Sequence, residues 1–325
     1  MTMLRILVRL ADILIAPCAA IAGICLRLVR MVGLEMMPLT RSALFSIGLL
    51  PVRRHYYEPF PNLERAGGPR GLPGIEWNLT EQWLLVDSFA WMEEIRGLTK
   101  RSIAGRIFDP HNPNFCGGDA DILYSMVRKL RPRTIIEIGC GYSTLVAAQA
   151  LQRNAGEGNP GRHVCVEPYE MRWLELIGVE VLRAPVEKIG VDFFETLASG
   201  DLLFIDSSHV VRAGGDVNYL ILEVLPTLAP GVTVHFHDIF SPADYPRLWT
   251  DEKALLWSEQ YLLEAFLSGS RDWEIVLAAN YLCHQDRKRL SERLPLMESD
   301  AEPGSIYIRR KETKVADFCG NSDSE

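Results

Sequence analysis

The sequence lacks paired cysteines, an excess of basic residues and internal repeats, and each absence excludes a class of protein. Its seven cysteines are scattered and form no CxxC pair, which excludes a zinc ribbon and a disulfide framework. Reduced thiols of this kind are typical of a cytoplasmic protein. The formal net charge of −8 disfavours a nucleic-acid partner, because polyanions bind basic surfaces.

Basic and apolar residues are concentrated at the N-terminus. Residues 1–54 contain seven arginines against Asp12 and Glu35, a net charge of +5, so the remaining chain carries −13. The run LADILIAPCAAIAGICLRLV (10–29) is long enough to span a bilayer as a helix, and arginines flank it. We therefore expect a helical extension that attaches the protein to the cytoplasmic face of a membrane. Three readings stay open, namely a spanning anchor or a re-entrant one bent at Pro17, an interfacial helix, and a helix packed on the body.

Composition divides the chain into five consecutive segments. They are the apolar and basic segment 1–54, a Pro/Gly-rich connector 55–77, a helical lead-in 78–132, the main domain 133–311 and a polar, mobile tail 312–325. Within the lead-in we expect one helix over 78–95, capped by Thr80, and another over 117–130.

Strands and helices alternate in the main domain. The apolar runs predict strands over 133–138, 162–167, 179–184, 201–206, 231–237, 272–278 and 305–310. Helices are expected between most of them, notably over 143–153, 215–228 and 254–268. This order predicts an α/β fold, a doubly wound sheet of seven mostly parallel strands. Between the last two strands, a short helix and a hairpin-like return stay open, and the last strand is expected to be antiparallel.

The first predicted strand ends in a glycine-rich turn, TIIEIGCGYST (134–144). Gly139 and Gly141 let the backbone approach a ligand closely. The helix that follows, beginning at Tyr142 and Ser143, offers free N–H groups to a carboxylate, and Glu137 can accept a hydrogen bond from an ammonium. A ligand with both an amino and a carboxylate group fits this turn.

Two other ligands fit the turn poorly. A dinucleotide site needs a third glycine, where this sequence has Thr144, and a phosphate-binding loop needs Gly-Lys-Ser/Thr, which is absent. The second strand ends in Glu167, which can bind both hydroxyls of a ribose. The third strand is followed by Val186 and Glu187, where an adenine ring would lie.

Four motifs together resemble the class I S-adenosylmethionine-dependent methyltransferases. They are RTIIEIGCGYSTL, VCVEPYE, LLFIDSSHV and VHFHDIF, and they are most similar to the branch with an IDGxH-like fourth strand that includes macrocin-type sugar O-methyltransferases. The resemblance covers residues 110–310. It implies a Rossmann-like sheet of seven strands and S-adenosylmethionine as cofactor. It also implies that Glu137, Gly139, Gly141 and Glu167 bind this cofactor.

The fourth and fifth strands end in groups that suit methyl transfer to oxygen. Asp206 ends one strand, His209 follows it, and His237 and Asp238 end the next. A hydroxyl acceptor must lose its proton, and we expect His209 to take it as general base. Asp206 and Asp238 either hold a divalent cation such as Mg²⁺, or orient the cofactor and His209. Resembling enzymes have a third acid where this sequence has His237, which weakens the Mg²⁺ interpretation.

The acceptor is expected to be a small or sugar-containing molecule. Aromatic residues in 241–267, among them Tyr245, Trp249 and Trp257, would suit a sugar ring or a phenol. Nucleic acid is disfavoured further, since the Asn/Asp-Pro-Pro-Tyr motif for an amino acceptor is absent. The alternatives are a nucleotide-dependent oxidoreductase and a non-catalytic, membrane-tethered binding protein on the same fold.

Overall fold

The computed structural model describes residues 2–52, 57–59, 62, 68–169 and 171–312. The chain divides into two compact units, residues 1–65 and 66–325. The connector predicted over 55–77 lies partly outside the described residues. The tail predicted over 312–325 lies almost entirely outside them, as does Cys319, whereas the six other cysteines are free thiols.

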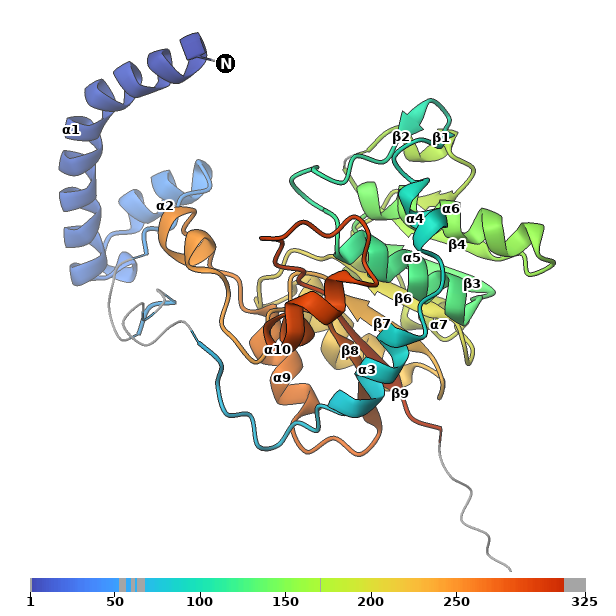
Figure 1. Ribbon diagram of the computed structural model, residues 1–325. Coiled ribbons are helices and arrows are strands. Elements are labelled where there is room, and N and C mark those ends of the chain that lie inside the picture. The colour runs from blue at the N-terminus through green and yellow to red at the C-terminus, as the bar shows by residue number, and fades with distance from the viewer. Residues whose placement is uncertain (1, 53–56, 60–61, 63–67, 170, 313–325) are drawn as a thin grey trace, which may run out of the picture. The chain divides into compact units, whose positions relative to one another are not determined.

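The first unit is dominated by one long helix. Helix α1 (Thr2–Val32) runs through Pro17 without interruption and curves along its length (Figure 1). It is long and apolar enough to cross a membrane, and only 6% of its most apolar stretch is buried. The chain does not turn back at Pro17, so the re-entrant bend expected there is absent from this described helix. A short helical turn (Leu34–Met36) and helix α2 (Pro38–Ser46) follow.

The second unit is built on a sheet of seven strands in the order β5-β4-β3-β6-β7-β9-β8. The strands are β3 (Thr134–Ile138), β4 (Arg162–Val166), β5 (Glu180–Leu182), β6 (Leu202–Ile205), β7 (Thr233–Phe236), β8 (Trp273–Ala278) and β9 (Ile306–Arg310). Strands β3 to β7 pair in parallel, and β9 lies antiparallel between β7 and β8. The predicted fold is confirmed, including its antiparallel last strand.

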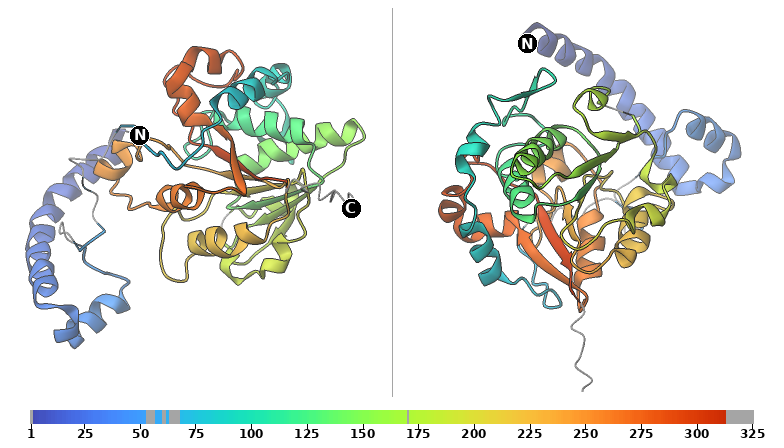
Figure 2. Two further views of the ribbon diagram at one scale, coloured as in Figure 1. Left: turned by 90° about the horizontal axis from the view of Figure 1, so that it is seen from below. Right: turned by 90° about the vertical axis from the view of Figure 1, so that its right-hand side faces the viewer.

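Helices cover both faces of this sheet (Figure 2). One apolar core holds α7 (Val191–Phe194), α8 (Asp216–Tyr219) with its continuation through Thr227, and α9 (Glu259–Leu267). The other holds α3 (Leu79–Asp87), α4 (Met92–Arg96), α5 (Asp119–Leu130), α6 (Tyr142–Gly156) and α10 (Ala279–Ser291). A hairpin of β1 (Ser102–Ile103) and β2 (Arg106–Ile107) precedes α5. The central strands β3, β6 and β7 are buried on both faces, as their continuous apolar runs require, whereas the edge strand β5 is largely exposed.

The helix predicted over 78–95 is wrong, because the chain forms α3 and α4 with a break between them. Val86 and Ile95 are both fully buried in the same core. On one straight helix they would point about half a turn apart, so the break lets both face the sheet. Asn78, rather than Thr80, precedes the first helical residue.

One helix boundary differs from expectation, and one open alternative is decided. Helix α9 begins at Glu259 rather than at residue 254, because residues 253–258 form an irregular segment in which Ser258 N–H donates to the carbonyl of His209. Helix α10 connects β8 to β9, which decides between the two alternatives left open there.

A buried carboxylate joins three elements at the end of β3. Glu137 is only 1% exposed. Its Oε1 accepts hydrogen bonds from Ser143 Oγ at 2.6 Å and Thr144 Oγ1 at 3.0 Å, and its Oε2 lies 2.7 Å from His163 Nε2 on β4. Thr144 Oγ1 also accepts the Gly141 N–H at 2.9 Å. The glycine turn is therefore held in place by hydrogen bonds to the buried carboxylate of Glu137 and to Thr144.

His163 carries the positive charge that compensates Glu137. Burial lowers the pKa of His163, but the side chains of Cys165 and Glu137 outweigh it and raise that pKa to about 10. A pKa above that of the unfolded chain means that the pair stabilises the fold fully below about pH 6.5. This contribution is lost as the pH rises through about 10.

We predict that His163→Leu lowers the free energy of unfolding by about 3–5 kcal/mol at neutral pH, because it leaves a buried carboxylate without its cation. The matched control is His284→Leu, which removes an ion pair of similar length, 2.8 Å to Glu302, at an exposed site. That change should cost about 1 kcal/mol or less. Urea unfolding of both variants measures the difference, and equal losses would contradict the role given to His163.

Candidate active site

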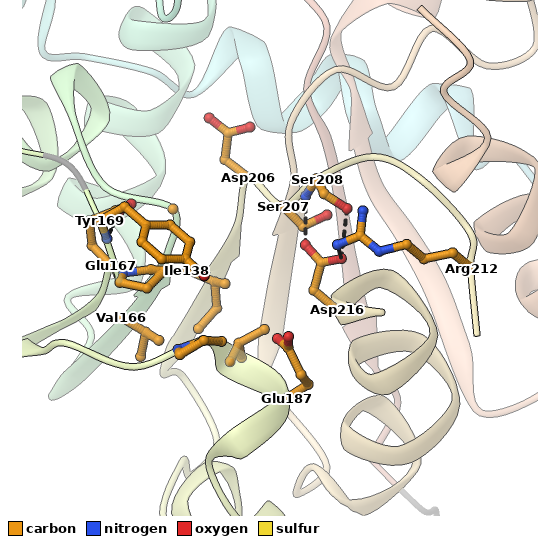
Figure 3. A pocket seen from close by; sticks show the side chains of 14 residues that line it. Ile138, Val166, Glu167, Tyr169, Glu187, Asp206, Ser207, Ser208, Arg212 and Asp216 are labelled. Carbon is orange, nitrogen blue, oxygen red and sulfur yellow. Dashed lines mark hydrogen bonds and ion pairs between the residues drawn. The ribbon is translucent and has the colours of Figure 1, made fainter. Parts of the chain in front are cut away.

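A cavity of about 480 Å³ opens at the carboxyl ends of the parallel strands (Figure 3). The chain passes from β3 to β4 and β5 on one side, then resumes with β6 and β7 on the other side of β3. Ligands of open α/β sheets bind where the strand order reverses in this way. Gly139 and Asp206, from the two strands at the reversal, both line the cavity, whose volume suits a small-molecule ligand.

The turn after β3 requires glycine at residue 139. Its φ is +74°, and a Cβ atom there would lie 1.9 Å from the carbonyl oxygen of Asp206. Asp206 N–H donates to the carbonyl of Ile138 at 2.9 Å, so the ends of β3 and β6 lie side by side. This close approach holds Asp206 at the edge of the cavity.

The ends of β4 and β5 form the next part of the wall. Glu167 accepts the Tyr169 N–H at 2.9 Å and the Cys140 N–H at 3.3 Å, which ties β4 to the glycine turn. Val186, which is 5% exposed, begins the helical turn after β5 and supplies an apolar surface. An acid and an apolar surface therefore lie next to each other, as a nucleoside requires.

The cavity does not include every residue predicted to bind the cofactor. Gly139, Glu167, Val186 and Asp206 line it, whereas Glu137, Gly141, Tyr142 and Ser143 do not. The carboxylate of Glu137 is occupied by Ser143, Thr144 and His163, so it is not directed at an ammonium group. Tyr142 packs against the apolar cores.

The opposite wall contains residues that sequence reasoning missed. Asp216 accepts the Ser208 N–H at 2.7 Å and the Ser208 hydroxyl at 2.6 Å, and lies 3.6 Å from Arg212. Figure 3 shows this group facing Glu167 and Tyr169 across the cavity. The sequence does hold a signal for this group of residues, because Ser208 lies two residues after Asp206 and Asp216 is the first residue of the next helix.

The ends of β6 and β7 bring four predicted residues together. His209 Nε2 lies 3.2 Å from Asp206 Oδ1 and 3.6 Å from Asp238 Oδ2. His237 lies beside the same two acids. His209 and Asp238 both have left-handed backbone angles, with φ of 60° and 58°. Such angles are uncommon outside glycine and persist where the surrounding structure enforces them.

His209 also has a partner that the sequence did not indicate. Glu259, 1% exposed at the start of α9, places its Oε2 2.8 Å from His209 Nδ1, while its Oε1 accepts the Ser207 hydroxyl. The ring of Trp257 lies 4.2 Å from that of His209. These contacts fix the imidazole so that Nε2 faces the two aspartates.

The cluster strongly favours positive charge on its histidines. Burial lowers the pKa of His209, but Asp206 and Glu259 outweigh it and raise that pKa to about 10. Burial would raise the pKa of Asp206, yet His237 and His209 hold it well below its usual range. Protons or a metal cation can supply the positive charge that these carboxylates require.

A divalent cation fits the donor atoms present. One donor atom each from Asp206, His209 and Asp238 lies within 4.8 Å of the others. Cations such as Mg²⁺ are commonly bound by one or two carboxylates and several waters. Asp206 and Asp238 would hold such an ion, which is one of the two roles that the sequence leaves open for them.

Comparisons with known proteins find distant relatives. The chain is 26% identical over 165 residues to an uncharacterized protein of Archaeoglobus fulgidus, covering 44% of this chain and 72% of that protein. The O-methyltransferase from Bacillus cereus in complex with SAH aligns over 72% of this chain and 98% of its own, with 16% identity and a TM-score of 0.37. The apo structure of CmcI-N160 aligns over 62% and 72%, with 14% identity and a TM-score of 0.35. Structural likeness this low carries no argument.

A family comparison is more direct. Residues 136–239 match the family described as a methyltransferase domain. The matched segment begins in β3 and ends just after β7, so it contains the glycine turn, the ends of β4 and β6 and the acidic cluster. The sheet around it has the seven strands and the antiparallel last strand that the resemblance implies. The match agrees with the class I S-adenosylmethionine-dependent methyltransferases that the sequence motifs resemble, and it assigns a methyltransferase domain to residues 136–239.

Proposed function

We propose that the enzyme transfers the methyl group of S-adenosylmethionine to a hydroxyl oxygen of a small, sugar-containing or phenolic acceptor. The observation that carries this proposal is the position of Asp206, which lines the cavity and also contacts His209. Methyl transfer needs the sulfonium carbon in line with the acceptor atom at close range. A donor in the cavity and an acceptor at His209 would meet at Asp206.

Different residues of the cavity wall would bind different parts of the cofactor. Glu167 would accept hydrogen bonds from the ribose hydroxyls, and Val186 would contact the adenine ring. The carboxylate end of the cofactor would lie near Gly141, Tyr142 and Ser143, at the start of α6. Space exists there, because a Cβ atom on Gly141 would meet only Met171 Cε, at 3.7 Å.

His209 is the proposed general base. Glu259 holds Nδ1, so Nε2 is the nitrogen that can receive the acceptor's proton. When no cation neutralises the neighbouring carboxylates, they raise the pKa of His209 and keep that nitrogen protonated. A cation held by Asp206 and Asp238 would compensate them and favour the neutral ring. Such a cation would also lower the pKa of a hydroxyl bound to it.

The surface beside His209 supports an acceptor with a ring. Trp257 and Trp249 are half-buried, with their rings 5.0 Å apart and nearly perpendicular. The exposed parts of these rings offer flat apolar surfaces of the kind that sugars and phenols contact.

We also propose that α1 attaches the enzyme to a membrane. Its large apolar side chains are exposed along most of its length, among them Ile15 and Ile21. Arginines lie near both of its ends. Length, exposed apolar surface and basic flanks support a helix anchored in a bilayer, with the enzyme on the cytoplasmic face.

The cofactor site predicts that Glu167→Gln weakens binding of S-adenosylhomocysteine about 10–100-fold, because hydrogen bonds to a charged group contribute about 1.5–3 kcal/mol. Isothermal titration calorimetry measures this, with Glu195→Gln, an exposed acid outside the cavity, as the control. A wild-type protein that binds a nicotinamide dinucleotide but not S-adenosylhomocysteine would overturn the proposal in favour of the oxidoreductase alternative.

The base assignment predicts that His209→Asn lowers methyl transfer at least about 100-fold while cofactor affinity changes little, since general bases contribute about 10²–10⁴-fold. Transfer from isotope-labelled donor to a panel of glycosides and phenols measures the rate, and mass spectrometry locates the methyl group. The control is His284→Asn, which changes an exposed histidine. Unchanged turnover in His209→Asn would refute the base, and methylation at nitrogen would refute the acceptor atom.

The anchor predicts that the wild-type protein stays with membranes after an alkaline carbonate wash, whereas the double variant Ile15→Lys, Ile21→Lys is released. Each lysine near the centre of a spanning helix costs about 2.5–3.5 kcal/mol. Leu39→Lys on α2, at an apolar residue that is even more exposed, is the control and should stay bound. Release of the wild-type protein by carbonate would instead indicate an interfacial helix. Recovery of the wild-type protein in the soluble fraction before the wash would indicate a helix packed on the body of the protein.

A further inference from the structure

His237 is a buried histidine whose inner nitrogen lacks a hydrogen bond. The residue follows β7 directly and is 4% exposed. Its Nδ1 has no hydrogen-bond partner among the described residues. This nitrogen lies 3.4 Å from Asp238 Oδ1 and 3.7 Å from Asp206 Oδ1. Leaving a buried polar atom unpaired is costly, so its orientation toward two carboxylates calls for an explanation.

The separations around His237 match a metal site better than a hydrogen-bond network. Hydrogen bonds from nitrogen to oxygen are usually 2.7–3.2 Å long, and both distances from His237 Nδ1 exceed this. Nitrogen and oxygen ligands about 2.0–2.2 Å from one metal ion lie about 3–3.6 Å from each other. The 3.4 Å separation falls in this range and the 3.7 Å separation lies just outside it, so an ion between Nδ1 and the two carboxylates requires a small shift of Asp206.

The far side of the His237 ring faces a buried carboxylate. Its Nε2 faces Asp119 Oδ2 at 3.8 Å. Asp119, 3% exposed on α5, is fixed by hydrogen bonds from Gly304 N–H, at 3.1 Å, and from the Ser305 hydroxyl. If the ring moved slightly toward it, this carboxylate would accept a hydrogen bond from Nε2, which would orient the ring and increase the basicity of the nitrogen that binds the metal.

We propose that Asp206, Asp238 and His237 Nδ1 bind a divalent transition-metal ion such as Mn²⁺, Fe²⁺ or Co²⁺ in preference to Mg²⁺. The proposal deepens the proposed function, since the ion would lie beside the acceptor, and it adds His237 as a ligand. Mg²⁺ is bound mainly by oxygen atoms, whereas imidazole nitrogen suits the later first-row metals. His237 stands where the resembling enzymes have a third acid, so the change from oxygen to nitrogen changes the metal preferred.

The test measures metal binding to the full chain without methyl donor. Wild-type protein is stripped with a chelator and titrated calorimetrically with Co²⁺, Mn²⁺ and Mg²⁺. We expect Co²⁺ and Mn²⁺ to bind at least about 10-fold more tightly than Mg²⁺, following the order of affinities for nitrogen-containing sites. His237→Leu should weaken Co²⁺ at least about 100-fold, because even loss of an outer partner costs about 10–100-fold. His237→Glu should restore Mg²⁺ binding and reverse the preference.

Two controls keep the result interpretable if a buried variant folds poorly. His111→Leu removes an exposed histidine that also lies beside two carboxylates, 2.8 Å from Glu298 and 3.4 Å from Asp109, and it should bind Co²⁺ as the wild type does. On the wild-type protein, pulsed electron paramagnetic resonance of bound Mn²⁺ should detect a directly coordinated imidazole nitrogen.

Either of two results would overturn the proposal, namely equal affinity of the wild type for Mg²⁺ and Co²⁺, or a folded His237→Leu that binds Co²⁺ normally. Binding of S-adenosylhomocysteine is measured separately on the metal-free protein. A protein that binds this compound but shows no metal preference refutes the metal proposal alone. One that binds the metal but not S-adenosylhomocysteine refutes the proposed function alone.

Discussion

The buried charge of Glu137 is the constraint on which the rest of the catalytic unit depends. A carboxylate at 1% exposure is tolerated only with strong partners, and it obtains them from α6 and from His163 on β4. These contacts fix the end of β3, the start of α6 and the neighbouring strand relative to one another. Gly139 is thereby held against the end of β6, and the edge of the cavity is set. Glu137, which the sequence suggested as a cofactor ligand, thus supports the site from the protein interior.

The second group of buried charges lies one strand further along the sheet, and it is arranged for chemistry rather than for rigidity. Four carboxylates surround two histidines there. Asp206 and Asp238 lie between the rings, while Glu259 and Asp119 support them from outside. Glu259 orients the ring of His209, Asp119 faces the ring of His237, and the inner pair faces the space where an ion and an acceptor would meet. This division explains why α5 and α9, which are far apart in sequence, both begin at this rim.

The sequence predicted what depends on neighbouring residues and failed where distant segments meet. All seven strands of the large sheet were located, because most of them are apolar runs buried on both faces, β5 at the sheet edge being the exception. Asp206, His209 and Asp238 were placed together because parallel strands end at one edge. The partner of His209 could not be found, since Glu259 arrives from a helix 50 residues later. Likewise, nothing local shows that Glu137 turns inward, because its orientation depends on His163 across the sheet.

Asp206 links the two halves of the site, and its charge affects donor and product differently. S-adenosylmethionine carries a positive sulfonium, which is lost when the methyl group leaves. A carboxylate at the cavity edge therefore attracts the donor more than the spent cofactor, and this attraction is strong where water is partly excluded. A cation bound between Asp206 and Asp238 would weaken the attraction while it favours a deprotonated acceptor. In the proposed site, metal occupancy and donor affinity would thus be coupled through one side chain, and each would change the other by the same factor.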